Sequence, residues 1–387
     1  MHGDKTSNSQ VNRKGNSLYL AKKMNSPIDY LSEIEDPRVD RTKDHLLEDI
    51  IFITIAAVIC GAHTWNDIEN YGNAKEIWLK QFLKLPEGIP THDTFNRVFS
   101  AIDPAQMEKC FINWVKSVCE LTEGEVVSID GKTIRGSRDK GSKSIVHMVS
   151  AWAQLNHLSL GQVKVDDKSN EITAIPKLLD ILIIKGCIVT IDAMGCQTEI
   201  ADKIIKKGGD YILAVKGNQG SLQEGIMDII KFTKPIETYE DLDFGHGRIE
   251  KRVCSIYTDF SHIENWERWK NLQCVAKIDS HRHIKSSGEN ETETRIYICS
   301  VTPSAEKIEK CIRAHWGIEN SLHWVLDVAF NEDKSMKTNP IAAENFSIIN
   351  RIALNLLSNE KSKKRSIKGK RLDAGWDNDY LNKILRN

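Results

Sequence analysis

The spacing of apolar residues divides the chain into a helical first part and a mixed second part. From residue 27 to residue 122, apolar positions recur at three- and four-residue steps, which is the period of a helix with one buried face. We predict helices near residues 46–60 and 65–83, a third that Thr91 or Asp93 caps, and a fourth after Pro104. The apolar run at residues 50–62 is too short to cross a membrane, so we expect no membrane partner. This pattern predicts an all-α N-terminal domain, either DNA-binding or a plain packing module.

Short apolar runs begin at residue 123 and indicate strands. One run ends at Asp130, two further strand candidates follow, and after a helix another run ends at Asp192. A helix at about 198–207 precedes one more strand. Strands that first follow one another and then alternate with helices predict a mixed sheet covered by helices, an α+β or α/β fold. Residues 220–303 are again rich in strand patterns, and we interpret them as a β-rich insertion into a domain that spans residues 123–357.

The segment that begins at Ser304 has the pattern of a long helix. Ser304 is a suitable N-cap, and apolar residues follow at helical spacing. At about 100° per residue, Ile308, Ile312 and Leu326 fall within roughly 20° of Glu319, so we expect Glu319 to face the core and to have a positive partner there. The two tryptophans of this segment, Trp316 and Trp324, are expected in the core.

The two ends of the chain differ in composition from the rest of the sequence. Residues 1–26 are rich in polar residues and are expected to form a mobile arm. Residues 358–387 are expected to form a basic tail, since seven of the eleven residues from 361 to 371 are Lys or Arg. The net charge of the chain is −1, so any nucleic-acid binding must come from such local patches. Nine scattered cysteines without a C-x-x-C pair favour a reducing, cytoplasmic compartment.

Three carboxylates suggest one reactive centre. Asp130 and Asp192 lie at strand ends, where an open sheet exposes functional groups, and Glu319 lies on an apolar helix face. Oxygen ligands alone suit Mg²⁺ or Mn²⁺, and two such ions would support displacement at phosphorus. Taken singly, an Asp after a strand is more often a turn former. Asp327, two helical turns after Glu319, is the rival third carboxylate.

Several cationic or imidazole side chains are candidate DNA contacts. Each has a plainer reading as a solvated charge or a structural histidine. The candidates are Lys132, Arg135, Lys216, His246, Arg248, His315 and His323.

Five motifs in order carry a resemblance to a known family. They are S-I-D-G-K-T-I-R-G-S, V-T-I-D-A-M-G-C-Q, Y-I-L-A-V-K-G-N-Q, G-H-G-R-I-E-K-R and R-A-H-W-G-I-E-N-S-L-H-W-V-L-D-V-A-F-N-E-D. Together with H-T-W-N-D-I and G-I-P-T-H-D-T-F-N-R-V-F, they resemble the insertion-sequence transposases of the H-repeat-associated group over residues 27–357.

The resemblance implies a DDE transposase with a ribonuclease-H-like catalytic core and a β-rich insertion. It makes Asp130, Asp192 and Glu319 the metal ligands, and it implies double-stranded DNA as the partner, a homodimer or larger assembly, and a location at the bacterial nucleoid. A related branch carries Tyr-x₂-Arg-x₃-Glu-x₆-Lys around its Glu, but Ile312, His315 and Leu326 occupy the Tyr, Arg and Lys positions here. A nuclease that does not transpose and an inactive DNA-binding relic remain as alternatives.

Overall fold

The computed structural model describes residues 26–135, 145–166, 169–245 and 247–386. All but the last residue of the expected N-terminal arm, 1–26, therefore lies outside the described residues, and so does His246. The nine cysteines are all free thiols, and most of them are buried. Among the described helices, none combines the length and the apolar character that a membrane crossing requires.

Nine strands form one mixed sheet with the order β3-β2-β1-β4-β5-β9-β8-β7-β6. Strand β1 pairs with β4, and β4 with β5, in parallel, while all the other neighbours are antiparallel. The strands are β1 (Val126–Ile134), β2 (Val146–Ala153), β3 (Leu158–Lys164), β4 (Ile188–Ile191), β5 (Asp210–Val215), β6 (Glu237–Gly245), β7 (Arg248–Tyr257), β8 (Cys274–Ile284) and β9 (Asn290–Cys299).

The helices before the sheet lie close to where the apolar spacing predicts them, and side chains cap several of their first turns. Thr91 caps α4 and Ser304 caps α9 through side-chain oxygens that accept backbone N–H groups, so both capping predictions are confirmed. The helices are α1 (Pro27–Leu31), α2 (Leu47–Ile59), α3 (Trp65–Leu79), α4 (His92–Phe99), α5 (Pro104–Val118), α6 (Glu171–Ile181), α7 (Thr198–Lys206), α8 (Gly220–Phe232), α9 (Ala305–Gly317), α10 (Trp324–Phe330), α11 (Pro340–Asn359), α12 (Ile367–Trp376) and α13 (Asn378–Leu385).

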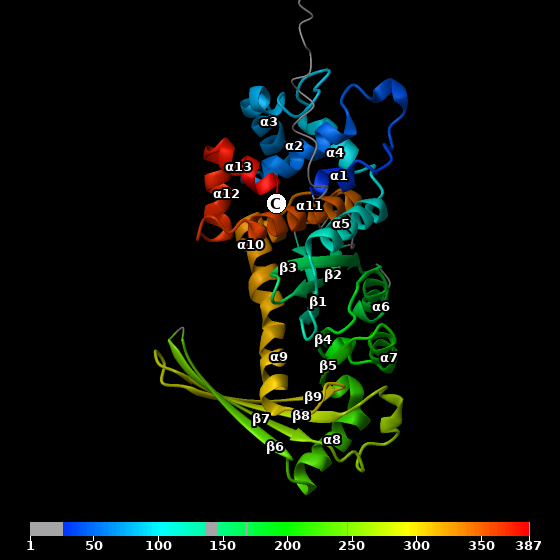
Figure 1. The fold of residues 1–387 in the computed structure, drawn as a ribbon, viewed down its shortest axis with the longest axis vertical. Coiled ribbons are helices and arrows are strands. Elements are labelled where there is room, and N and C mark those ends of the chain that lie inside the picture. The colour runs from blue at the N-terminus through cyan, green and yellow to red at the C-terminus, as the bar shows by residue number, and fades with distance from the viewer. Residues whose placement is uncertain (1–25, 136–144, 167–168, 246, 387) are drawn as a thin grey trace, which may run out of the picture.

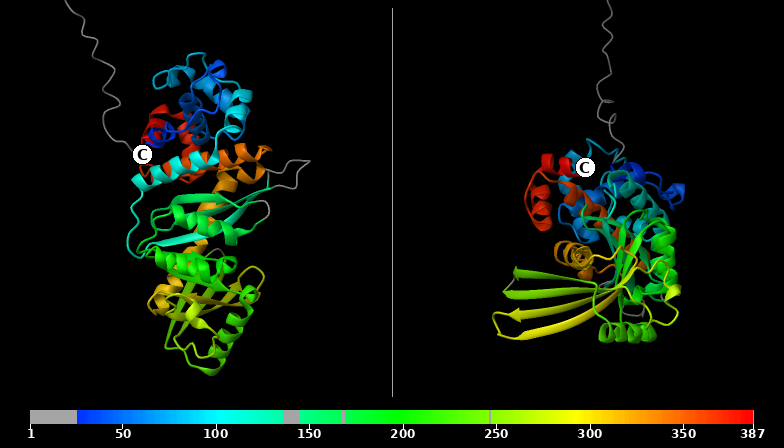
Figure 2. Two further views of the ribbon diagram at one scale, coloured as in Figure 1. Left: turned by 90° about the vertical axis from the view of Figure 1, so that its right-hand side faces the viewer. Right: turned by 60° about the horizontal axis from the view of Figure 1, so that its bottom comes forward.

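Helices from both ends of the chain form one layer above the sheet (Figures 1 and 2). Helix α11 packs on α2 and α5, and α12 and α13 also contact α2. The residues expected as a basic tail thus form two packed helices. The physical reason is that α12 and α13 carry an apolar face that includes Ala374, Leu381 and Ile384, all of them fully buried. Basic residues dominate the composition of this segment, but they do not determine its fold.

Helices also cover the two faces of the sheet. Helix α9 runs across β1 and β4 and continues over β6 and β7, while α6 packs on β2 and β3 and α7 on β5 (Figure 1). Strand β1 therefore lies in the middle of the molecule, with α9 on one side. The segment predicted as β-rich, residues 220–303, contains α8 and the four strands β6–β9, which continue the same sheet beyond β5. These strands project from the body as an arm (Figure 2, right).

Candidate active site

The fold brings Asp130, Asp192 and the helix of Glu319 to one region. Strands β1 and β4 are parallel neighbours, and Ile129 of β1 is level with Ile191 of β4. The residues that follow these two isoleucines, Asp130 and Asp192, therefore lie side by side. Asp192 follows the last residue of β4, and its Oδ1 accepts the backbone N–H of Met194 at 3.0 Å. Side chains alternate along a strand, and Asp130 points to the face of β1 that α9 and α10 cover.

Glu319 approaches Asp130 from a π-helix rather than from a regular α-helix. Residues Ile318–His323 form this π-helix, η6, between α9 and α10. One ligand atom each from Asp130, Glu319 and His323 lie within 4.8 Å of one another. The described residues contain no other group of three His, Cys, Asp or Glu side chains at this spacing.

The expectation that Glu319 faces the core is wrong. Its side chain is 51 % exposed, whereas Ile308, Ile312 and Leu326 are buried as predicted. A π-helical turn holds one more residue than an α-helical turn, so the phase shifts along the helix and Ile318 takes the fully buried position. The basic side chain beside Glu319 is His323, whose Nδ1 lies 3.6 Å from the Glu319 Oε2.

The three carboxylates differ in their electrostatic environment. Burial and the neighbouring Glu319 carboxylate raise the pKa of Asp130. Burial and the charge of Glu171 raise the pKa of Asp192, and Lys216 acts in the opposite direction. His323 lowers the pKa of Glu319. Carboxylates that repel one another in a half-buried site are typical of places that hold a cation.

His315 lies one helical turn before Glu319, and its ring is hydrogen-bonded to Thr190. The Thr190 hydroxyl donates to Ser128 Oγ at 3.2 Å, so the His315 Nδ1–H, at 2.9 Å, donates to the Thr190 Oγ1. Burial lowers the pKa of His315 to about 4, which leaves the ring neutral at pH 7. The ring thus anchors α9 to β4, and we do not retain it as a DNA contact.

Lys132 is enclosed by carboxylates and is not free to bind phosphate. Only 7 % of its side chain is exposed, and its Nζ lies 2.6 Å from Asp327 Oδ1, 3.0 Å from Asp333 Oδ1 and 3.6 Å from Glu332 Oε2. Glu332 also pairs with the fully buried Arg351 at 3.1 Å. These ion pairs tie α10 and the turn after it to β1, two residues from Asp130. Asp327, the rival third carboxylate, is therefore engaged with Lys132.

The remaining candidate DNA contacts have different surroundings. Arg135 is 83 % exposed at the end of β1, and Lys216 is exposed just after β5. Arg248 lies in the arm, where its Nε is 3.7 Å from Glu250 Oε2. Lys216, whose charge acts on Asp192, thus stays as a candidate beside the carboxylates. Arg135, whose Nε lies 3.7 Å from Asp333 Oδ2, and Arg248 stay as more distant candidates.

The two tryptophans expected in the core are exposed instead. Trp316 is 47 % and Trp324 60 % exposed, and the Arg295 guanidinium lies 4.9 Å above the Trp316 ring. Trp316 lies near the end of α9 and Trp324 begins α10, and both are on the solvent side, so the prediction is wrong. The apolar character of a residue does not by itself show which face of the helix the residue lies on.

The sequence analysis missed a second acidic group on the opposite face of β1. Glu171, at the first turn of α6, lies 2.8 Å from His147 Nε2, and the Thr133 hydroxyl lies 2.8 Å from Nδ1 of the same ring. A Cβ added to Gly131 would overlap the Glu171 carboxylate, which explains the glycine that follows Asp130. Only the Asn-Glu pair at a helix start marks Glu171 in the sequence, and that signal is common to many helix N-termini.

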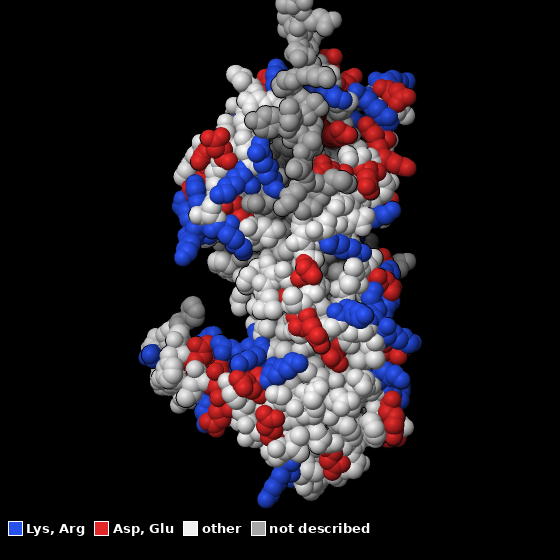
Figure 3. All heavy atoms as spheres, viewed as in Figure 1, with Lys and Arg blue, Asp and Glu red and all other residues white. Residues whose placement is uncertain are grey.

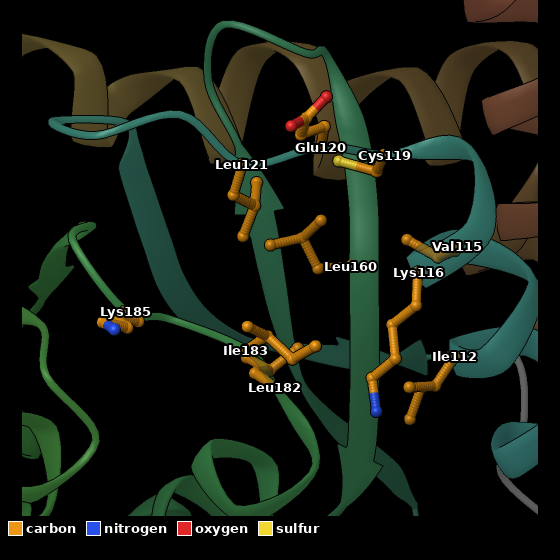
Figure 4. Close-up of a pocket in the computed structure, with 10 residues that line it drawn as sticks. All are labelled: Ile112, Val115, Lys116, Cys119, Glu120, Leu121, Leu160, Leu182, Ile183 and Lys185. Atoms are coloured by element: carbon orange, nitrogen blue, oxygen red, sulfur yellow. The ribbon is translucent and has the colours of Figure 1, made fainter.

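An apolar pocket lies away from these residues. It is formed by α5, β3 and the segment before β4, where Leu121, Leu160 and Leu182 converge and Lys116 runs along one wall (Figure 4). None of the candidate site residues lines it. The pocket therefore adds nothing to the chemistry of the carboxylates.

Comparison with known families defines the class of this protein. Residues 121–356 match the transposase DDE domain, and residues 28–115 match the domain described as DDE_Tnp_1-associated. The chain belongs to the transposase DDE domain family.

Individual relatives indicate the group within this family. The chain is 44 % identical to "Putative transposase YncI" of Escherichia coli O157:H7, over 93 % of this chain and 94 % of that protein. It is 42 % identical to "H repeat-associated putative transposase YhhI" of Escherichia coli K12, over 92 % of this chain and 97 % of the relative. The resemblance to the H-repeat-associated group is therefore confirmed. A solved piggyBac transposase complex with hairpin DNA covers 92 % of this chain and 76 % of its own chain, with 11 % identity and a TM-score of 0.39, a likeness too low to support an argument.

Proposed function

We propose that this protein is an active DNA transposase that cuts phosphodiester bonds at the ends of a mobile element and joins the freed 3′-hydroxyl to target DNA. Asp130, Asp192 and Glu319 hold Mg²⁺ or Mn²⁺, two ions in the full complex. When bound, such ions activate the attacking oxygen and stabilise the leaving oxygen of an in-line displacement.

The observation that carries this proposal is the close approach of Glu319 to Asp130, beside the strand end that carries Asp192. The parallel register places Asp130 beside Asp192, and the ligand atoms of Asp130 and Glu319 fall within 4.8 Å of each other. Oxygen donors at this spacing fit a hard divalent cation. Lys132 keeps Asp327 away from this role, which favours Glu319 as the third ligand.

The strand order supports a ribonuclease-H-like core. Strands β3, β2 and β1 form an antiparallel meander, and β4 and β5 follow in parallel beside β1. In this reading the core ends at β5, and α8 with β6–β9 is the insertion before the helix of Glu319. The catalytic carboxylates then come from the central strand, its parallel neighbour and the helix after the insertion.

The reaction also requires partners. We propose double-stranded DNA, both element ends and target, and an assembly of at least two copies, because two ends must be held together for joining. Lys216, which is exposed and acts on Asp192, is proposed to contact a phosphate near the cut, and the exposed Arg135 a phosphate further along the DNA.

The test is metal-dependent nicking and joining on DNA that carries the flanks of the gene. We expect joined product with the wild-type protein, and we expect Glu319→Gln to reduce it by about 100-fold or more, because the loss of a ligand removes the metal. Glu306→Gln is the matched control, since Glu306 is exposed on α9, the helix before η6, and among the described residues its ion pair is with Lys310.

Each alternative has its own outcome. Equal activity of Glu319→Gln and the wild type would overturn the assignment of Glu319. Hydrolysis without joined product would identify a nuclease, and DNA binding without any cleavage would identify an inactive relic.

A further inference from the structure

His323 is a buried ring whose hydrogen bonds are not satisfied. It is 5 % exposed, and its Nε2 is buried without a hydrogen-bond partner among the described residues. Its Nδ1 lies 3.5 Å from Asp130 Oδ2 and 3.6 Å from Glu319 Oε2, both longer than an ordinary N–H···O hydrogen bond. Nδ1 is the nitrogen that faces both carboxylates, and neither carboxylate lies at ordinary hydrogen-bond length, so its position requires an explanation.

The π-helix is what turns this ring toward the carboxylates. It carries both Glu319 and His323, while Ile318 and Leu322 of the same segment are fully buried. The acidic and imidazole side chains therefore point to Asp130 from neighbouring positions of one helix. Single π-helical turns are frequent at functional sites for this reason.

The three ligand atoms have the spacing of a metal site. With metal–ligand distances of about 2.1 Å, neighbouring ligands of an octahedral ion are separated by roughly 3 Å and opposite ones by roughly 4 Å. The two separations from Nδ1, 3.5 and 3.6 Å, lie between these values. A small closure around an ion would complete the site without a change of fold.

We propose, on the basis of the proposed function, that His323 is a direct metal ligand through Nδ1, together with Asp130 and Glu319. Two carboxylate oxygens and one imidazole nitrogen suit a first-row transition ion better than Mg²⁺, which prefers oxygen ligands and water. The position near Glu319 therefore binds Mn²⁺ more tightly than Mg²⁺. A ring that is 5 % exposed between two carboxylates is poorly placed to reach a phosphate, which argues against a DNA contact at His323.

The experiment measures the ligand directly and not the activity. Wild-type protein is loaded with Mn²⁺, and pulsed electron paramagnetic resonance detects coupling of the metal to a directly bound nitrogen. We expect ¹⁴N coupling that changes to the ¹⁵N pattern when the histidines are ¹⁵N-labelled, a test that needs no variant. Bound Mn²⁺ without any nitrogen coupling would overturn the proposal.

Variants then assign the nitrogen to this residue. We expect His323→Gln to lose the coupling and to weaken Mn²⁺ binding by about tenfold or more, with a smaller effect on Mg²⁺ measured by competition. His262→Gln, on an exposed histidine in the segment before β8, is the control and should change neither quantity. Nitrogen coupling that persists in His323→Gln would assign it to another histidine and overturn the proposal.

The same titrations separate this inference from the proposed function. If Asp130→Asn and Glu319→Gln abolish Mn²⁺ binding but no nitrogen coupling exists, only the role of His323 fails. If neither carboxylate affects Mn²⁺ binding, the metal centre of the proposed function fails as well.

Discussion

At the scale of single residues, Lys132 has the largest set of charged contacts near the candidate site. Burial opposes its charge, but Glu332 and Asp327 outweigh burial and raise the pKa of its ammonium group. Its three carboxylate partners come from α10 and from the turn that follows it. Lys132 is thus a positioning residue that holds the helix of Glu319 against the strand of Asp130.

We predict that Lys132→Met lowers the free energy of unfolding by about 2–4 kcal/mol, because it leaves buried carboxylates without their cation. The side chains of Asp327 and Asp333 are 32 % and 28 % exposed, which keeps the loss below that of a fully buried pair. Denaturant unfolding measures it. Lys334→Met, an exposed neighbour of this cluster, is the control and should stay within about 0.5 kcal/mol of the wild type. A loss equal to that of the control would show that the ion pairs contribute nothing.

At the scale of elements, a buried lysine lies where α3 meets α11. Lys337 is 6 % exposed, its Nζ donates to the His63 carbonyl at 2.7 Å, and it lies 3.4 Å from the centre of the Phe346 ring. The ring favours the ammonium form, but burial dominates and lowers the pKa of Lys337 to about 7. The folded protein therefore holds fewer protons than the unfolded chain between pH 7 and the ordinary lysine pKa of about 10.4.

It follows that this lysine makes the protein more stable as the pH rises above about 7, by at most about 1.4 kcal/mol per pH unit. Below pH 7 both states carry the charge, and the contribution is constant. The measurement is denaturant unfolding at several pH values between 6.5 and 9, for the wild type and Lys337→Met. Buried thiols titrate in part of the same pH range in both proteins. Subtracting the two curves removes their contribution and leaves that of Lys337. A difference that does not change with pH would contradict the prediction, and Lys334→Met should follow the wild type.

At the scale of the whole molecule, positive charge gathers over the C-terminal helices, although the net charge is −1 (Figure 3). Lys361, Lys364 and Lys368 are exposed there, and no carboxylate in the described part of the chain pairs with them. Helix α12 contacts α10, the helix that continues directly from η6. The basic cluster therefore lies on a helix that contacts the one continuing from η6, and we propose that DNA entering the site passes over it.

Duplex binding should therefore depend on this cluster. The triple variant Lys361→Gln, Lys364→Gln and Lys368→Gln is expected to reduce the slope of log affinity against log salt by about 3, since each lost phosphate contact removes about 0.9. Fluorescence anisotropy without divalent ions measures binding apart from cleavage. The control changes Lys109, Lys116 and Lys185, three exposed lysines outside this cluster, to Gln. Equal salt slopes for the two triple variants would exclude the cluster as the DNA contact.

The sequence by itself determined many of the local elements and predicted which carboxylates share a site. Apolar spacing located α2, α5 and α9, and the strands that end at Asp130 and Asp192, because burial of one face imposes a period that survives in a single sequence. The family motifs also pointed to Glu319, and the comparisons confirmed the family.

Tertiary structure alone decided which side chains share a site. The π-helix exposes Glu319, and a one-residue change of helical phase leaves no mark in the apolar pattern. The engagement of Lys132 by Asp327, and the packing of the C-terminal helices on α2, join residues roughly 200 to 300 positions apart. Contacts between residues so distant in the chain depend on how the whole sheet and its helices pack, and no local pattern records that packing.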